Sequence, residues 1–328
     1  MDQRRATKER QLTLFGMQIP RWALRVAQLA MAAALLAFLW RAADGPAAAR
    51  SLASAEWPWL AAAFLALTLQ TLLSALRWRL TAAQLGISLG RGHAVREYYL
   101  AQVVNQSLPG GMIGDAGRAL RARGQAGLLA SGLAVAFERL AGQVAMFLAM
   151  TAAFIATIAM PGGLEWPRWL AVPVALLILG GAASPIVLLG AARLPGAVGR
   201  SAASFWRKLH LALAARGVLS RQVALSVGTT VCILGAFAFC AEAVGVRLEL
   251  SEVLGLVPII LFTMLIPLTV SGWGLREGAA AALFPLAGAS ASAGLAASVA
   301  FGLVFIVTVL PGLLFLSRKP VADVVKPW

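Results

Sequence analysis

Residues 105–118 of the chain read NQSLPGGMIGDAGR and residues 266–278 read IPLTVSGWGLREG, two broken stretches that lie beside long apolar runs. Both follow the spacing Pro-x4-Gly-x3-Arg, whose members are Pro109, Gly114 and Arg118 in the first stretch and Pro267, Gly272 and Arg276 in the second. Proline lacks a backbone donor and glycine lets the backbone approach a neighbour closely, so an uninterrupted membrane helix avoids both. Broken backbone at membrane depth persists only where it is buried in protein or lines a cavity. Such paired breaks predict a binding site between two halves of a membrane protein.

The composition defines the class of protein. Hydrophobic residues make up 60% of the chain, charged residues make up 12%, and the mean hydropathy is +0.82. Several runs approach the ~20 apolar residues that cross ~30 Å of hydrocarbon. We therefore expect an all-α polytopic membrane protein. The net charge of +15 does not indicate a nucleic-acid partner, because the basic residues fall between the apolar runs, where the positive-inside rule places them.

Metal and cofactor sites are not predicted. Cys232 and Cys240 lie in one apolar run, about 12 Å apart along a helix, which is too far for a disulfide. His93 and His210 lie in basic loops without a neighbouring cluster of cysteines or carboxylates. The glycines at 110, 111 and 114 do not follow the strand–helix pattern of a nucleotide-binding loop. We expect no metal, no cofactor and no nucleotide hydrolysis.

Hydropathy predicts six crossings, at residues 22–40, 59–76, 128–160, 169–189, 223–244 and 295–316. The segment 98–113 is too short and too polar to cross, and basic residues flank it on both sides, so it predicts a re-entrant hairpin. The segment 254–287 predicts a second hairpin that opens to the opposite face. The alternative is that this second element crosses twice, which gives eight passes.

The distribution of charge predicts the topology. Most of the 28 lysines and arginines fall on one side, so we expect a bacterial-type cytoplasmic (inner) membrane protein with both termini cytoplasmic. The predicted parts are a basic N-terminus at 1–21, a first membrane repeat at 22–160, an external loop at 161–168, a second repeat at 169–317 with a basic cytoplasmic loop at 193–221, and a tail at 318–328. Each repeat has two spans, a hairpin and one span, and the two start on opposite sides. This is an inverted repeat, as in alternating-access carriers.

The basic loop contains a further pattern. Phe205, Leu209 and Leu213 recur every fourth residue among arginines and lysines. This spacing predicts an amphipathic helix on an anionic leaflet. A solvated basic connector is the alternative.

Charged residues inside apolar runs are the candidate site residues. A charge near the bilayer centre costs ~2.5–3.5 kcal/mol, so it normally faces a partner or a wet cavity. Glu138 and Arg139 are adjacent in sequence, as are Arg276 and Glu277. Adjacent residues on a helix do not face each other, so we expect each charge to pair elsewhere, for example Glu138 with Arg276. Asp115 either caps the following helix or pairs with Arg118.

Two interpretations of these charges remain open. In the first, Arg118 and Arg276 with exposed hairpin amides form two half-sites for a phosphate, one in each leaflet. In the second, Glu138, Arg276 and their neighbours are buried ion pairs that fix helix packing, and Arg118 only sets topology.

The motifs resemble the transmembrane domain of lysylphosphatidylglycerol synthases, whose stand-alone relatives are called flippase-like proteins. The resemblance covers nearly the whole chain. The residues that carry it are Asn105, Pro109, Gly110, Gly114, Asp115 and Arg118 in the first stretch, Glu138 and Arg139 in the third run, and Gly272, Trp273, Arg276 and Glu277 in the second stretch. The resemblance implies that these residues bind or move lipid. In the synthases this domain moves aminoacylated lipid between leaflets and a separate soluble domain makes that lipid. We expect no synthase activity, because no such domain follows the last predicted span.

Three functions are compatible with these observations. The favoured one is a translocator of an anionic phospholipid or a polyprenyl-phosphate lipid, without enzymatic activity. The second is a membrane-embedded partner of a glycosyltransferase or a lipid synthase. The third is a membrane enzyme that acts on a lipid phosphate, with Asp115, Glu138 or Glu277 as the acid or base. Oligomeric state does not follow from the sequence.

Overall fold

The structure is a computed structural model that describes residues 12–14, 17–19, 21–107, 112–159, 165–266 and 268–315. It confirms an all-α polytopic membrane protein. Five helices are long and apolar enough to cross a membrane, and the count reaches six if α1 and α2, bent by 93° at the break between them, form one span. The crossing helices are α1 (Arg21–Ala42) with α2 (Gly45–Ala53), α3 (Trp57–Gln84), α5 (Ile113–Ala159), α6 (Arg168–Ala192), α8 (Leu219–Ala243) and α11 (Ala291–Val309), which continues into η3 (Leu310–Phe315).

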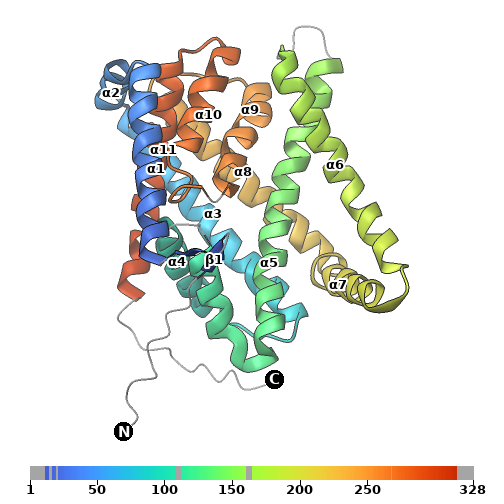
Figure 1. Cartoon of the computed structure of the whole chain (residues 1–328). Coiled ribbons are helices and arrows are strands. Elements are labelled where there is room, and N and C mark those ends of the chain that lie inside the picture. The colour runs from blue at the N-terminus through green and yellow to red at the C-terminus, as the bar shows by residue number, and fades with distance from the viewer. Residues whose placement is uncertain are drawn as a thin grey trace.

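The first broken stretch forms a helical hairpin. Its arms are α4 (Arg91–Ser107) and the part of α5 that precedes Gly127, where φ of 82° interrupts the helix. Contacts at three levels show that the arms run antiparallel: Asn105 with Asp115, Glu97 with Arg121, and Ser88 with Gln125. Both arms open toward the end of the molecule where α1 begins (Figure 1). Pro109 and Gly110 lie outside the described residues.

The second broken stretch forms another hairpin, which opens at the other end (Figure 1). Its arms are α9 (Leu250–Phe262) with η1 (Thr263–Leu265), and α10 (Leu275–Leu283) with η2 (Phe284–Ala287). At 1.5 Å per residue α9 is about 20 Å long and α10 about 14 Å, and both are shorter than the ~30 Å of hydrocarbon. These lengths favour a re-entrant hairpin over the eight-pass alternative. Pro267 lies outside the described residues.

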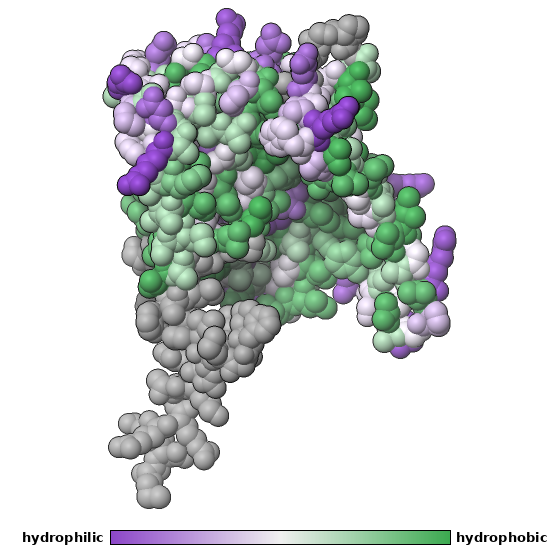
Figure 2. Space-filling view, turned by 45° about the horizontal axis from the view of Figure 1, so that its top comes forward, coloured by the Kyte–Doolittle hydropathy of each residue, from purple (hydrophilic) through white to green (hydrophobic). Residues whose placement is uncertain are grey.

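The main hydrophobic core joins the two halves of the chain. Phe237 of α8 packs against Phe284 and Phe301, with ring centroids 6.3 and 5.4 Å apart. In contrast, α6 buries only Leu170 and Val174. Figure 2 shows that apolar residues cover most of the flank of the molecule, whereas hydrophilic residues gather at its upper end. Such a surface fits a hydrocarbon environment.

Two elements were not predicted in full. The basic loop contains α7 (Gly196–Ala214), which confirms the helix expected there and packs Phe205 against Phe137 of α5 with ring centroids 5.3 Å apart. The N-terminal segment contains a short antiparallel strand pair that was not predicted, β1 (Leu12–Leu14) with β2 (Met17–Ile19).

Candidate functional site

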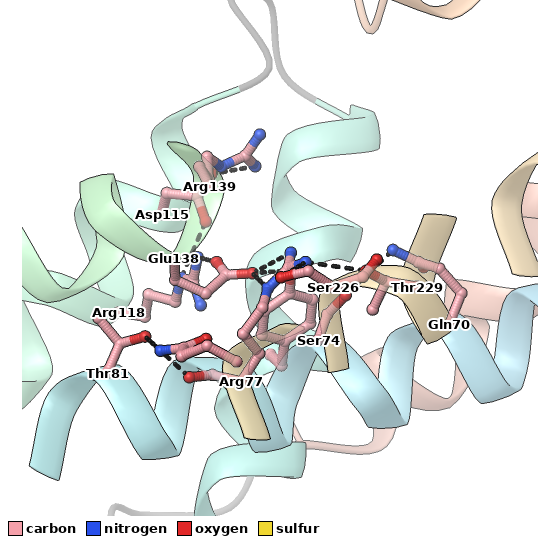
Figure 3. Close-up of polar contacts among 12 residues, drawn as sticks. Gln70, Ser74, Arg77, Thr81, Asp115, Arg118, Glu138, Arg139, Ser226 and Thr229 are labelled. Atoms are coloured by element: carbon pink, nitrogen blue, oxygen red, sulfur yellow. Dashed lines mark hydrogen bonds and ion pairs between the residues drawn. The ribbon is translucent and has the colours of Figure 1, made fainter. Parts of the chain in front are cut away.

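Glu138 is the centre of a buried ionic cluster. Its side chain has no exposed surface and accepts hydrogen bonds from Arg77 at 2.8 Å and from Arg118 at 2.9 Å. The hydroxyl of Tyr98 donates a third bond at 3.3 Å. Figure 3 shows Glu138 between the two guanidinium groups, one from α3 and one from the first hairpin. The carboxylate therefore ties three elements together: α3, the hairpin and the long part of α5.

Asp115 is the second carboxylate of the cluster. It accepts a hydrogen bond from Arg118 at 2.9 Å and forms an ion pair with Arg139. Asn105 donates its amide to Asp115 at 3.0 Å and accepts the backbone N–H of Gly114 at 2.7 Å, so it closes the hairpin near its tip. Of the two alternatives for Asp115, the structure therefore shows the pair with Arg118.

Arg118 is 1% exposed, so it is not a solvated cation that sets topology. Its guanidinium lies 4.8 Å from the ring centroid of Trp78 and 4.6 Å from that of Tyr98. Aromatic faces of this kind stabilise a desolvated cation. Its Nη1 is buried without a hydrogen-bond partner. Arg118 is thus a buried part of the ionic cluster, and its Nη1 group is a donor without an acceptor.

The cluster carries an excess positive charge. Three arginines (Arg77, Arg118 and Arg139) meet two carboxylates (Asp115 and Glu138), which leaves one positive charge in excess. Arg139 is the most accessible of the three, with a side chain 34% exposed, and its Nε is buried without a partner. An uncompensated buried charge is costly, so the cluster favours a nearby anion.

A cavity of about 240 Å³ lies beside the cluster. Arg139, Asp115, Glu138, Asn105 and Arg77 line one wall. The remaining polar lining consists of amides and hydroxyls, chiefly Gln70, Gln102, Gln106, Gln143, Thr230 and Ser271, and the apolar lining includes Ile233, Leu261 and Phe305. A hollow in the apolar surface with hydrophilic residues at its base is visible in Figure 2. The cavity therefore has a polar wall, lies beside a cluster with one excess positive charge and is surrounded by hydrophobic surface.

The two broken stretches meet at this cavity. Ser271, from the second stretch, donates a hydrogen bond to the side chain of Gln106, at the end of α4. Ser271 is a non-glycine residue with φ of 50°, and Gly272 beside it has φ of 77°. These left-handed conformations turn the chain sharply at the tip of the second hairpin. Both stretches thus contribute residues to one cavity, and the binding site predicted between the two halves stays a prediction.

The second stretch places its charges away from the cavity. Arg276 pairs with its neighbour Glu277 at 2.5 Å and donates to the hydroxyl of Ser298 at 2.9 Å. Its guanidinium lies 5.2 Å from the ring centroids of both Trp273 and Phe301. Arg276 and Glu277 are 1% and 0% exposed, and neither they nor Gly272 and Trp273 line the cavity.

Two predictions about pairing were therefore wrong. Arg276 does pair with the adjacent Glu277, because both belong to the first turn of α10, where the carboxylate also accepts the N–H of Gly274 at 2.6 Å. The pair of Glu138 with Arg276 does not form, since Glu138 is occupied by Arg77 and Arg118. Glu138 and Arg139 pair elsewhere, as expected.

Arg77 was not among the predicted site residues, because the second predicted crossing ends at residue 76. In the structure α3 continues to Gln84 and buries Arg77, which is 4% exposed. A signal was present: Gln70, Ser74, Arg77 and Thr81 lie at the spacing of one helix face. This polar face packs on α8, where Arg77 donates to Thr229 at 2.8 Å and Gln222 donates to Thr81 at 2.8 Å.

The fold and the site define a polytopic helical membrane protein with a buried ionic cluster beside a polar cavity. The chain belongs to the family described as the lysylphosphatidylglycerol synthase transmembrane region, whose family model matches residues 25–312. No individual curated protein matches the chain. Among the described residues no group of three or more histidines, cysteines and carboxylates could hold a metal ion.

Proposed function

We propose that the protein moves an anionic, phosphate-bearing lipid between the leaflets of a bacterial-type cytoplasmic membrane through the central cavity, without hydrolysing nucleotide. The observation that carries this proposal is the one excess positive charge of the ionic cluster beside the cavity, with Arg139 as the accessible arginine on the cavity wall. Membership of a family named after a membrane region of a phospholipid synthase supports a role in lipid handling.

The phosphate of the lipid would complete the ionic cluster. The Nε of Arg139 lacks a hydrogen-bond partner, and its Nη2 is already paired with Asp115. A phosphate that accepts from Arg139 balances the five charges and uses a donor that is otherwise buried without a partner. Gln102, Gln106 and Gln143 supply further amide donors around it. The protein contacts then replace the water that hydrates the head group. Transfer of the charged head group into bare hydrocarbon would instead cost many kcal/mol.

In this proposal the phosphate is bound by Arg139, and not by Arg118 and Arg276 as one interpretation of the sequence predicted. Arg118 and Arg276 are each held by a carboxylate and two aromatic rings and do not line the cavity. For these two residues the geometry supports the alternative interpretation, in which buried ion pairs fix helix packing. The proposed transport therefore uses one phosphate site and not one in each leaflet.

An inverted repeat would let this single site face each side in turn. The order of two spans, a hairpin and one span occurs in both halves, and the hairpins open at opposite ends (Figure 1). The contact of Gln106 with Ser271 joins their tips across the cavity. Alternating access would open the cavity toward one face and then the other by rocking one half against the other. Both termini are cytoplasmic in this proposal.

Reconstitution into liposomes tests the proposal. The full chain is incorporated with fluorescent phosphatidylglycerol, phosphatidylcholine or polyprenyl phosphate, and quenching of the outer leaflet reports translocation. Anionic lipids should equilibrate faster than in empty vesicles. Arg139→Gln should slow them about 10- to 100-fold, which corresponds to the ~1.5–3 kcal/mol of a hydrogen bond to a charged group.

Arg121→Gln is the matched control, because Arg121 also lies on α5 and pairs with Glu97 but is absent from the cavity lining. It should transport like the wild type. Arg139→Lys keeps the charge without the planar fork and should fall between the two. If no lipid is accelerated by folded protein, with or without an ion gradient, transport is excluded and a non-transporting partner of a lipid-modifying enzyme becomes the better proposal.

A further inference from the structure

The corner formed by α6, α7 and the start of α8 is strongly and uniformly basic. Residues 166–241 contain no aspartate or glutamate. The basic residues of the connecting region are Arg193, Arg200, Arg207, Lys208, Arg216 and Arg221. In the part of the chain that the structure describes, none of these six forms a salt bridge. None of these six residues lines the central cavity.

One face of α7 forms a groove with α5. The groove is lined on α5 by Leu129 and Leu133, and on α7 by Ala197, Arg200, Ser201, Ser204, Phe205 and Lys208. The α7 positions recur at helical spacing, so they lie on one face of that helix. Contact of Phe205 with Phe137 holds α7 at this distance from α5. The groove is therefore a built feature of the packing.

The groove has a polar and an apolar part. Arg200 and Lys208, with the hydroxyls of Ser201 and Ser204 between them, form the polar part. Leu129 and Leu133 also belong to an adjoining apolar depression that includes Leu128 and Gly132. Leu129 is 68% exposed, so its side chain is accessible to an acyl chain. Cations beside lipid-facing leucines match the two ends of one phospholipid molecule.

We propose that this groove binds an anionic phospholipid. Arg200 and Lys208 would hold its phosphate and Ser201 and Ser204 would donate to the phosphate oxygens, while an acyl chain would follow Leu129 and the adjoining depression. Charge complementarity selects this occupant, because a cationic groove without a carboxylate attracts anionic head groups and an apolar extension requires acyl chains. The site lies apart from the transport cavity and does not depend on the proposed transport.

The test measures lipid binding to the purified full chain. Detergent-solubilised protein is titrated with phosphatidylglycerol or with phosphatidylcholine of the same chains, and bound lipid is counted by native mass spectrometry. The Arg139→Gln background is used throughout, so that binding in the central cavity does not contribute. We expect phosphatidylglycerol to bind at least about fivefold more tightly than phosphatidylcholine, from the attraction of one or two basic residues.

The double variant Arg200→Gln/Lys208→Gln should weaken phosphatidylglycerol binding about tenfold or more. Its matched control is Arg216→Gln/Arg221→Gln, which removes the same charge from the same basic region outside the groove and should change binding by less than about twofold. Leu129→Gln, at a position that is 68% exposed, should weaken binding through the acyl chain alone. Equal binding of the two lipids, or equal loss in both double variants, would overturn the proposal of a site.

Discussion

Arg118 and Arg276 hold matching positions in the two broken stretches, and their surroundings are alike. Each is 1% exposed, each lies between two aromatic rings, and each pairs with a glutamate, Glu138 for the first and Glu277 for the second. The repeated spacing thus corresponds to a repeated environment. A buried arginine in both places is stabilised by the same combination of carboxylate and aromatic faces.

The two regions differ in their balance of charge. The second is a neutral pair, closed by Ser298 and remote from the cavity. The first collects three arginines and two carboxylates and borders the cavity through Arg139. Equal motifs can thus occupy equivalent positions while only one of them borders a cavity. What separates them is the extra arginines, Arg77 and Arg139, which lie outside the shared motif.

The largest expected effect concerns the faces to which the two hairpins open. In a chain without Cys232 and Cys240, a cysteine in place of Gln125 should react with an impermeant thiol reagent from the cytoplasmic side only. A cysteine in place of Ser251 should react from the outside only. If both positions react from one face, the hairpins do not form an inverted pair.

Glu138→Gln should be the most destabilising single substitution in the ionic clusters. It leaves Arg77 and Arg118 without their shared carboxylate, and breaking a buried pair by removing one partner costs about 3–5 kcal/mol. Thermal unfolding in detergent, followed by fluorescence-detected gel filtration, measures the loss. Glu97→Gln is the control, because its partner Arg121 has a side chain 37% exposed, and it should cost about 1 kcal/mol or less. Equal losses would mean that the cluster does not support the fold.

The matched glycines provide a second comparison. A methyl group at Gly114 would overlap the backbone carbonyl of Ala101, and overpacking of this kind costs about 1–3 kcal/mol. At Gly272, φ of 77° adds about 1–2 kcal/mol for any other residue, and the methyl would lie 2.9 Å from the Cα of Met264. Gly124→Ala, which meets open space, should be neutral or stabilising. Wild-type melting temperatures for Gly114→Ala and Gly272→Ala would contradict the tight packing of both hairpins.

The smallest effect is expected when a neutral pair is removed as a whole. Arg276→Met/Glu277→Gln deletes one charge of each sign and keeps an acceptor for the N–H of Gly274, so stability should change by about 1 kcal/mol and transport should persist. Arg118→Met/Glu138→Gln makes the same exchange in the first region. There it leaves Arg77 without a carboxylate beside the cavity and should reduce both stability and transport. Transport that depends equally on both pairs would restore the model of two phosphate half-sites.

Much of the fold could be predicted from local sequence. The long apolar runs at 59–76 and 169–189 became α3 and α6, because crossing hydrocarbon requires about 20 apolar residues with all backbone groups bonded internally. The hairpins followed from proline, glycine and flanking charge. The full length of α3 could not be predicted in this way. The apolar run ends at Leu76, but the helix continues to Gln84 and buries Arg77.

The candidate site was predicted in part. Asn105, Asp115, Glu138 and Arg139 do line the cavity, and the sequence marked them as charges or amides at membrane depth. Their pairing could not be predicted, because ion pairs join residues on different helices, and the choice among several nearby arginines depends on distances of a few ångströms. The cavity itself combines residues of α3, α4, α5, α8, α9 and η1 with Ser271 and Phe305.

The sequence by itself determined the class of protein, the positions of the two breaks and the burial of charge beside them, because hydropathy and backbone chemistry are local properties. Only the tertiary structure decided which charges compensate one another. Arg276 pairs with the next residue, Glu277. Glu138 instead pairs with Arg77 of α3, and its neighbour Arg139 lines the cavity. Net charge at a site is a sum over residues brought together by packing, and local sequence does not contain that sum.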